Sequence, residues 1–104
     1  MKRKYLVVYE KLPANFGGMA PDILGCVSVG DTLEEMRANM IEALESHFVA
    51  TVEDGISIPE PTTTTIDFSP ESEDFDPNVL YTVVEWLEVD VPVVKGLHAF
   101  AAAD

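Results

Sequence analysis

The 104-residue chain contains one cysteine, two histidines and six basic residues, and each shortage excludes a class of protein or site. A single cysteine cannot form an internal disulfide, so the chain is not a disulfide-stapled secreted scaffold. The histidines are isolated, and no CxxC or HxxxH pattern occurs, whereas a structural zinc site needs four convergent ligands. We therefore predict no metal site.

Long apolar runs and glycine-rich loops are also missing. The basic start MKRK is followed by only five apolar residues, YLVVY, which is too short for a signal-peptide core or a membrane span. Neither the GxGxxG spacing nor the P-loop spacing of phosphate-binding loops is present. We expect a cytoplasmic protein with no membrane partner and no cofactor.

Positive charge is scarce, and the net charge is −13. Between residues 12 and 94, Arg37 is the only cation, against seventeen carboxylates. Such a surface repels phosphate backbones and anionic lipid, so we expect no direct binding of nucleic acid. It favours a basic protein partner, mainly by accelerating the encounter. Acidity that serves solubility alone is the other interpretation.

The order of elements predicted from the sequence is β-β-β-α-β within one domain, residues 1–104. Aromatic and β-branched residues favour the strands. The predicted strands cover residues 4–11, 16–20, 26–29 and 79–91, and a helix of about twenty residues follows the third strand.

The helix is the clearest element. Its start offers two capping boxes, Asp31 with Glu34 or Thr32 with Glu35. The motif EDG ends it, with Gly55 in the left-handed conformation. Apolar residues three and four apart predict a face that packs on a core. That face consists of Leu33, Met36, Met40, Leu44 and either His47 or Phe48.

The first and last strands carry apolar side chains on both faces, although one helix can cover only one face of a sheet. The other face needs a cover, either the short tail at 92–104 or another protein chain. Another chain is favoured because the tail is short and alanine-rich, and self-association into a dimer or higher oligomer is expected. The candidate residues for a chain–chain contact are Tyr5, Val7, Leu80, Val84 and Trp86.

Residues 62–78 are predicted to form an acidic loop or insertion. The stretch DFSPESEDFD carries five carboxylates in ten residues but lacks the glycine that a calcium loop uses at its sharp turn. We expect it to steer a cationic partner. The steering candidates are Glu71, Glu73, Asp74 and Asp76.

Cys26 could in principle be a catalytic nucleophile, so an enzymatic interpretation is considered. A catalytic thiolate needs a cation beside it, and His47 and His98 are far away in the sequence. A cysteine in a strand is usually a small buried apolar residue. We predict no catalytic residue. The alternative is a small-molecule-binding or enzymatic domain in which Cys26, His47 or several carboxylates converge.

The stretch from residue 15 to 61 contains a characteristic combination of turn, cap and proline positions. These positions are Phe16, Pro21, Asp22, Gly25, Cys26, Gly30, Asp31, Thr32, Glu34, Glu35, Asp54, Gly55, Ile58, Pro59 and Pro61. With them the chain resembles the HicB-like antitoxin family of HicA/HicB toxin–antitoxin pairs. The resemblance extends from about Tyr5 to Pro61, and the last strand fits the closing strand of the family.

The resemblance implies an α+β, partial RNase H-like fold. In that fold an antiparallel meander is followed by one long helix on one face and a final strand alongside the first. The resemblance also implies a non-catalytic domain that neutralises a small basic HicA-type toxin, an enzyme that cleaves mRNA. A solitary homo-oligomeric protein without a toxin is the alternative within the same family.

The chain departs from the family pattern in three places. Leu24 stands where the family usually has proline, and 62–78 is longer than the usual link to the last strand. Thirteen residues follow Val91, too few for the ribbon-helix-helix or helix-turn-helix module that many of these antitoxins carry. The resemblance therefore implies no contact of this chain with operator DNA.

Overall fold

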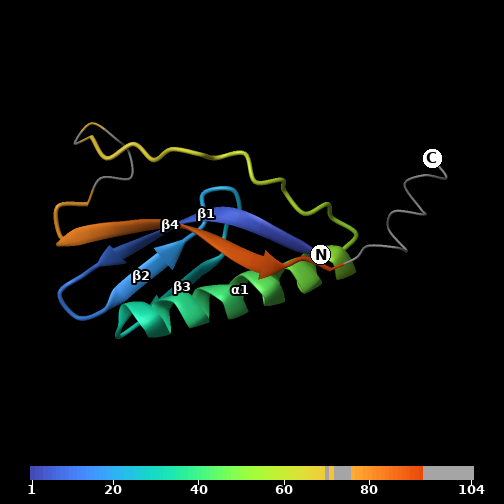
Figure 1. Cartoon of the computed structure of the whole chain (residues 1–104), viewed down its shortest axis with the longest axis horizontal. Helices are drawn as coiled ribbons and strands as arrows, with labels where there is room; N and C mark the ends of the chain where they lie inside the picture. Colours follow the sequence, from blue (N-terminus) through green and yellow to red (C-terminus); the bar gives the residue numbers. More distant parts are fainter. Residues whose placement is uncertain (70, 72–75, 93–104) are drawn as a thin grey trace.

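A four-stranded antiparallel sheet carries one long helix on one face in the computed structural model, which describes residues 1–69, 71 and 76–92 (Figure 1). The elements are β1 (Lys2–Lys11), β2 (Phe16–Met19), β3 (Val27–Gly30), α1 (Leu33–Glu53) and β4 (Tyr81–Asp90). The strand order β3-β2-β1-β4 is a meander with the last strand added beside the first. The predicted α+β fold is confirmed.

The longest strand pairing joins the two elements that are farthest apart in the sequence. β1 and β4 pair over ten positions, from Lys2 opposite Asp90 to Lys11 opposite Tyr81. β1 and β2 pair over only four, from Val8 opposite Met19 onward. The central strand β1 is therefore held mainly by the last strand.

The start of α1 uses the second of the two predicted capping boxes. Thr32 is the N-cap residue, and its Oγ1 accepts a hydrogen bond of 3.1 Å from the Glu35 N–H. Glu35 Oε1 in turn accepts a hydrogen bond of 3.3 Å from the Asp31 N–H. The hydroxyl satisfies an amide of the first helical turn, and the carboxylate bonds the amide just before the N-cap, one position earlier than in the standard capping box.

The end of α1 is a Schellman motif. Gly55 has a φ of 74°, as predicted, and its N–H donates to the Val52 carbonyl at 3.0 Å. The Ile56 N–H donates to the Thr51 carbonyl, also at 3.0 Å. These two bonds satisfy carbonyls of the last turn and lead the chain out of the helix.

The hydrophobic core lies between α1 and the sheet. Phe48, not His47, completes the predicted helical face, and the buried members of this face are Met36, Met40, Leu44 and Phe48. The sheet contributes side chains from its central strand and from β4 to the same cluster. These are Tyr5, Val7, Tyr9, Leu87 and Val89.

Tyr5 and Val7 are therefore core residues, which corrects their prediction as chain–chain contacts. Both side chains are 0% exposed, because odd-numbered residues of β1 face α1. Both faces of this strand are apolar, so its sequence alone did not distinguish the face under the helix from the outer face.

Residues 56–68, here called the strap, cover part of the outer face of the sheet. Figure 1 shows the strap as a yellow-green trace along the side opposite α1. Leu6 and Val8 of β1 are 4% and 6% exposed, although their side chains point away from the helix. The cover predicted to come from another chain is thus supplied over β1 by the strap. The tail residues 93–104 lie outside the described residues.

Within the part of the chain that the structure describes, the only helix is α1, and it is not apolar enough over its length to cross a membrane.

Candidate interaction surface

An apolar surface, here called the β4 patch, is formed by Leu80, Val84 and Trp86. Their exposed fractions are 63%, 38% and 49%. Val84 lies opposite Val8 and Trp86 opposite Leu6, so both side chains share the face that carries the strap. Three of the five predicted contact residues are therefore exposed, on one strand and its start. An exposed cluster of this kind is typical of a protein contact.

The strap is fastened to the meander by Asp22. Its carboxylate accepts hydrogen bonds from the backbone N–H groups of Thr62 and Thr63, at 2.9 and 3.0 Å. It also accepts the two threonine hydroxyls, at 3.1 and 2.7 Å. Farther back along the strap, the buried Tyr5 hydroxyl donates to the Pro59 carbonyl at 2.6 Å. Two independent anchors thus hold the strap against the sheet.

Hydrogen bonding controls the pKa of Asp22. Burial alone would raise this pKa, but the bonds from the side chains and backbone of Thr63 and Thr62 outweigh burial and lower it. Folding therefore stabilises the ionised form of Asp22 relative to the unfolded chain. The anchor is fully formed above the ordinary pKa of an aspartate, about 3.9, and is lost as the pH falls through the lower folded value.

We expect the Asp22→Asn variant to release the middle of the strap at neutral pH, because the neutral amide replaces one acceptor oxygen by a donor. The amide protons of Thr62 and Thr63 should then exchange with solvent about tenfold faster than in the parent protein. Hydrogen exchange followed by NMR checks this. Asp67→Asn is the control, since that carboxylate accepts from the nearby Ser69 N–H, at 2.9 Å, and has no bond to Thr62 or Thr63 among the described residues. Equal protection of the two threonines in all three proteins would contradict the role of Asp22.

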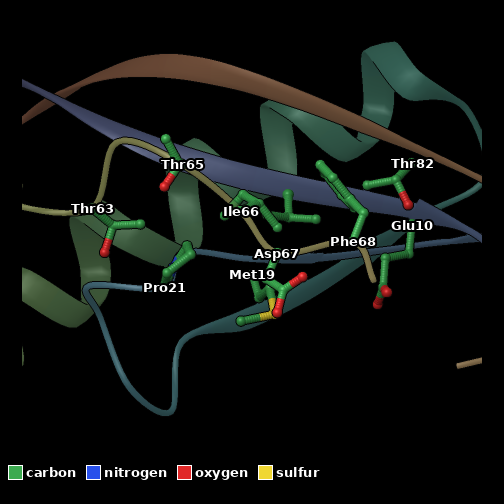
Figure 2. Close-up of a pocket in the computed structure, with 10 residues that line it drawn as sticks. Glu10, Met19, Pro21, Thr63, Thr65, Ile66, Asp67, Phe68 and Thr82 are labelled. Atoms are coloured by element: carbon green, nitrogen blue, oxygen red, sulfur yellow. The ribbon is translucent and has the colours of Figure 1, made fainter. Parts of the chain in front are cut away.

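A small cavity of about 210 Å³ lies between the strap and the sheet. Figure 2 shows Thr63, Ile66 and Phe68 of the strap along it, with Glu10 and Met19 from the sheet. The volume is below the roughly 300–1,000 Å³ of sites that enclose small molecules. The carboxylates of Glu10 and Asp67 line this cavity together with Phe68, so its boundary is apolar and acidic at once.

The acidic character continues to the start of β4. A second cavity of about 220 Å³ is lined by Glu10, Asp67 and Asp76 together with Tyr81. Of the four predicted steering residues, Glu71 and Asp76 are exposed. Glu73 and Asp74 lie outside the described residues. Acidic groups thus lie next to the β4 patch.

Glu85 of β4 connects the sheet with the helix. Its Oε1 accepts a 2.8 Å hydrogen bond from the Tyr9 hydroxyl, and Arg37 of α1 donates to both carboxylate oxygens at 2.7 and 2.9 Å. Arg37 lowers the pKa of Glu85, whereas burial and the bond to Glu85 raise the pKa of Tyr9. Both oxygens are engaged, so this group holds the helix on the sheet. Sequence reasoning missed the group formed by Glu85, Tyr9 and Arg37. The available signal was that Glu85 is a charged residue at an odd-numbered position of β4, on the same face as the core residues Leu87 and Val89.

Cys26 and His47 occupy different environments. Cys26 is 5% exposed and belongs to the core cluster, and burial raises the pKa of its thiol. His47 lies on α1 outside that cluster. A buried protonated thiol is a poor nucleophile, which favours the structural interpretation of Cys26. Among the described residues, no three His, Cys, Asp or Glu side chains are grouped so as to hold a metal ion.

The environment of Cys26 predicts low reactivity. We expect a thiol reagent to label the folded protein about 100-fold more slowly than the urea-unfolded chain, because labelling requires local opening. The reaction is followed by absorbance at neutral pH. Free cysteine measured in the same urea concentration corrects for solvent effects. Labelling of the folded protein at the rate of free cysteine would contradict the burial of this thiol.

A family model matches most of the chain. The family model described as the HicB-like antitoxin of bacterial toxin–antitoxin systems matches residues 5–98. The chain is also 35% identical, over 94 residues, to an uncharacterised 14.9 kDa protein in the rep-hol intergenic region of Haemophilus phage HP1 (strain HP1c1). That match covers 88% of this chain but only 65% of the phage protein.

Solved structures with a similar fold include two of at least 25% identity. The chain is similar to a component of the HicA3 and HicB3 toxin–antitoxin complex (25% identity, TM-score 0.58) and to the N-terminal domain of Burkholderia pseudomallei antitoxin HicB (26%, 0.58). Each match covers 88% of this chain and all of the other. A toxin–antitoxin complex from Streptococcus pneumoniae shares the fold, with a TM-score of 0.72 at 16% identity, over 96% of this chain and 73% of that one.

Proposed function

Because the chain belongs to the HicB-like antitoxin family, we propose that it binds and neutralises a small basic HicA-type toxin that cleaves mRNA. The observation that carries this proposal is the family match over residues 5–98, together with the similarity to a component of a HicA3–HicB3 complex. The chain acts by occupying the toxin and not by catalysis.

The surface supports a basic partner in two ways. The β4 patch supplies apolar surface that would be buried on binding. Burial of apolar surface is the main favourable term in protein association. The net charge of −13, with Asp67 and Asp76 beside the patch, attracts cations at longer range. A small RNA-cleaving protein needs basic residues to hold its substrate, and the acidic surface competes with RNA for them.

The direct test uses a purified HicA-type toxin, sought first among small basic proteins encoded next to this chain. Purified toxin should cleave a reporter mRNA, and adding this chain should abolish cleavage at a stoichiometric ratio. Size-exclusion chromatography should show both proteins in one complex. Undiminished cleavage with a tenfold molar excess of this chain would refute the proposal.

Removing the steering charges should slow the association. We expect a variant in which all four steering residues are replaced by Asn or Gln to bind the toxin about 3–10-fold more slowly at low salt, with a weaker salt dependence. The dissociation rate should change little. Stopped-flow mixing at two salt concentrations measures both rates. The variant replaces Glu71, Glu73, Asp74 and Asp76.

A control for net charge removes four other exposed carboxylates. If location matters, this variant should slow association less than the steering variant does. Equal on-rates at both salt concentrations for the parent and the steering variant would contradict the steering role. The control replaces Asp31, Glu42, Glu53 and Asp54.

Self-association is the second contact proposed. An apolar edge separate from the β4 patch lies on β3. It consists of Val27 and Val29, whose exposed fractions are 71% and 60%. Sedimentation velocity between 5 and 500 μM should show a dimer or larger species that dissociates on dilution. A monomer throughout this range would contradict the proposal.

A further inference from the structure

We infer that the free edge of β4 binds an extended segment of the cationic partner as an added β-strand, with alternating apolar and Lys or Arg side chains. The inference rests on the proposed function, because it assigns a binding mode to the partner proposed above. It concerns the backbone of residues 82–88, not only the apolar side chains beside it.

The hydrogen-bond pattern identifies which backbone groups are free. The Val91 N–H donates to the Met1 carbonyl at 2.7 Å, and the Met1 amino group donates to the Val91 carbonyl at 3.2 Å. This exchange marks a hydrogen-bonded pair, and such pairs alternate along an antiparallel ladder. In the register of β1 with β4, the odd-numbered residues of β4 therefore bond to β1.

From Thr82 onward the even-numbered residues of β4 direct their N–H and C=O groups to the open side, whereas Leu80, just before the strand, donates its N–H to the Lys11 carbonyl at 2.7 Å. One contact confirms this parity, since the Asp90 N–H donates to Glu45 Oε2 of α1 at 2.7 Å and not to β1. β4 is the last strand in the order β3-β2-β1-β4 of the described sheet. The open backbone groups belong to Thr82, Val84, Trp86 and Glu88.

The edge of β4 lacks proline, lysine and a bulge, three of the features that usually prevent strand pairing, and the charges that it does carry, Glu85 and Glu88, disfavour an acidic partner and not a cationic one. Residues 82–88 contain no proline and no lysine, and β4 pairs with β1 through ten consecutive positions with no bulge in the register. The other edge of the sheet differs. β3 is only four residues long, and Asn39 Nδ2 already donates to its Val29 carbonyl at 2.8 Å.

The side chains beside the edge define what an added strand must carry. On the strap side, Val84 and Trp86 are exposed and would contact apolar residues at alternate positions of the incoming segment. On the helix side, Glu45 lies next to the end of β4, as its bond to Asp90 shows. An added strand with alternating apolar and basic residues would place its apolar side chains on the strap side and its basic side chains on the helix side.

Charge favours a cationic protein over a second copy of this chain. A second copy paired at this edge would bring its own Glu85 and Glu88 against those of the first. Two bases near β4 are already engaged, since Lys2 pairs with Asp90 at 3.1 Å and Arg37 with Glu85 at 2.7 Å. The carboxylates of Asp67 and Asp76 near the start of the strand thus attract cations from a partner.

Proline at position 84 tests the backbone directly. The Val84 N–H points to the open edge, so Val84→Pro removes a donor for an added strand without breaking a bond to β1, and proline is tolerated at such edge positions. We expect this variant to bind the basic toxin about tenfold more weakly or worse. Val84→Thr is the matched control, because it keeps the N–H and the branched shape, and it should bind within about threefold of the parent.

Hydrogen exchange of the unmodified protein gives a second readout that does not depend on the folding of a variant. In the complex with the toxin, the amides of Val84, Trp86 and Glu88 should exchange at least about tenfold more slowly than in the free protein. The odd-numbered amides of β4 are bonded to β1 already and should change less.

The outcomes separate the two proposals. If the parent neither binds nor inhibits the toxin, the proposed function fails. If the parent inhibits but the even-numbered amides gain no protection and Val84→Pro binds as well as Val84→Thr, strand addition alone is refuted. Protection of these amides in the free protein that rises with its concentration would show a second copy on the edge. That result would overturn the assignment to a cationic partner.

Discussion

Replacing Gly30 by alanine is expected to lower the free energy of unfolding by about 3 kcal/mol. Gly30 ends β3 directly before α1, and a Cβ there would lie 2.6 Å from Met36 N and 2.7 Å from Met36 Cα. These are backbone atoms of the helix, so no side-chain rotation relieves the clash. The first turn of α1 must shift away from the sheet. Urea unfolding followed by circular dichroism measures the loss.

Two neighbouring glycines provide graded controls. At Gly17 the nearest atom to a new Cβ is Leu12 Cδ1 at 4.0 Å, so Gly17→Ala should change stability by less than about 1 kcal/mol. At Gly18 the Cβ would meet Met36 Cε at 2.7 Å, but this flexible side chain can move, and an intermediate loss is expected. A loss at Gly30 no larger than at Gly17 would contradict the packing described here.

The second large effect is expected for Phe48→Ala, which should lower the free energy of unfolding by about 3–5 kcal/mol. Phe48 is 0% exposed, and its ring centroid lies 5.4 Å from that of Tyr5. Truncation removes the burial of an aromatic side chain and leaves a cavity between α1 and β1. The same urea titration checks this. Since a domain of this size is stabilised by about 5–15 kcal/mol, this loss removes a large fraction of the total stability.

The adjacent residue gives the matched comparison for Phe48. Val49 follows it on α1 and is 48% exposed, so Val49→Ala should change the free energy of unfolding by no more than about 0.5 kcal/mol. If the two truncations cost the same, the assignment of the buried face of α1 is wrong.

Local sequence signals were sufficient to predict the helix and the order of the elements. The capping pair Thr32 and Glu35, the apolar spacing from Met36 to Phe48 and the turn at Gly55 each act within a few residues, so they can be seen in the sequence. The strand ends differ from prediction by a few residues, as at β1, which starts at Lys2 instead of Lys4.

The strap was not predicted, because its anchors are distant in sequence. Asp22 is 40 residues from Thr62, and Tyr5 is 54 residues from Pro59. Neither contact has a local pattern. The apolar outer face of β1 therefore indicated correctly that another segment covers it. Which segment does so depends on the path of residues 56–68 across the sheet, and no local pattern shows that path.

The candidate surface was predicted in part. Alternation along β4 placed Val84 and Trp86 on one face, and both are exposed. Alternation along β1 could not show which of its two apolar faces lies under α1, so Tyr5 and Val7 were assigned to a contact although they are buried. Whether β4 lies at an edge depends on the order of the strands in the sheet, and the periodicity of the sequence does not show this order.

The pairing of β1 with β4 also has a consequence for synthesis. Lys2 lies opposite Asp90, the last residue of β4, so the longest pairing of the central strand can form only after residues 81–90 have left the ribosome. Such distant pairings slow folding, because a large loop closes before the contacts form. The edge assigned to the partner is completed in the same step. A nascent or truncated chain that lacks β4 would therefore not offer the edge that we assign to the partner, so the proposed neutralisation would require that β4 has been made.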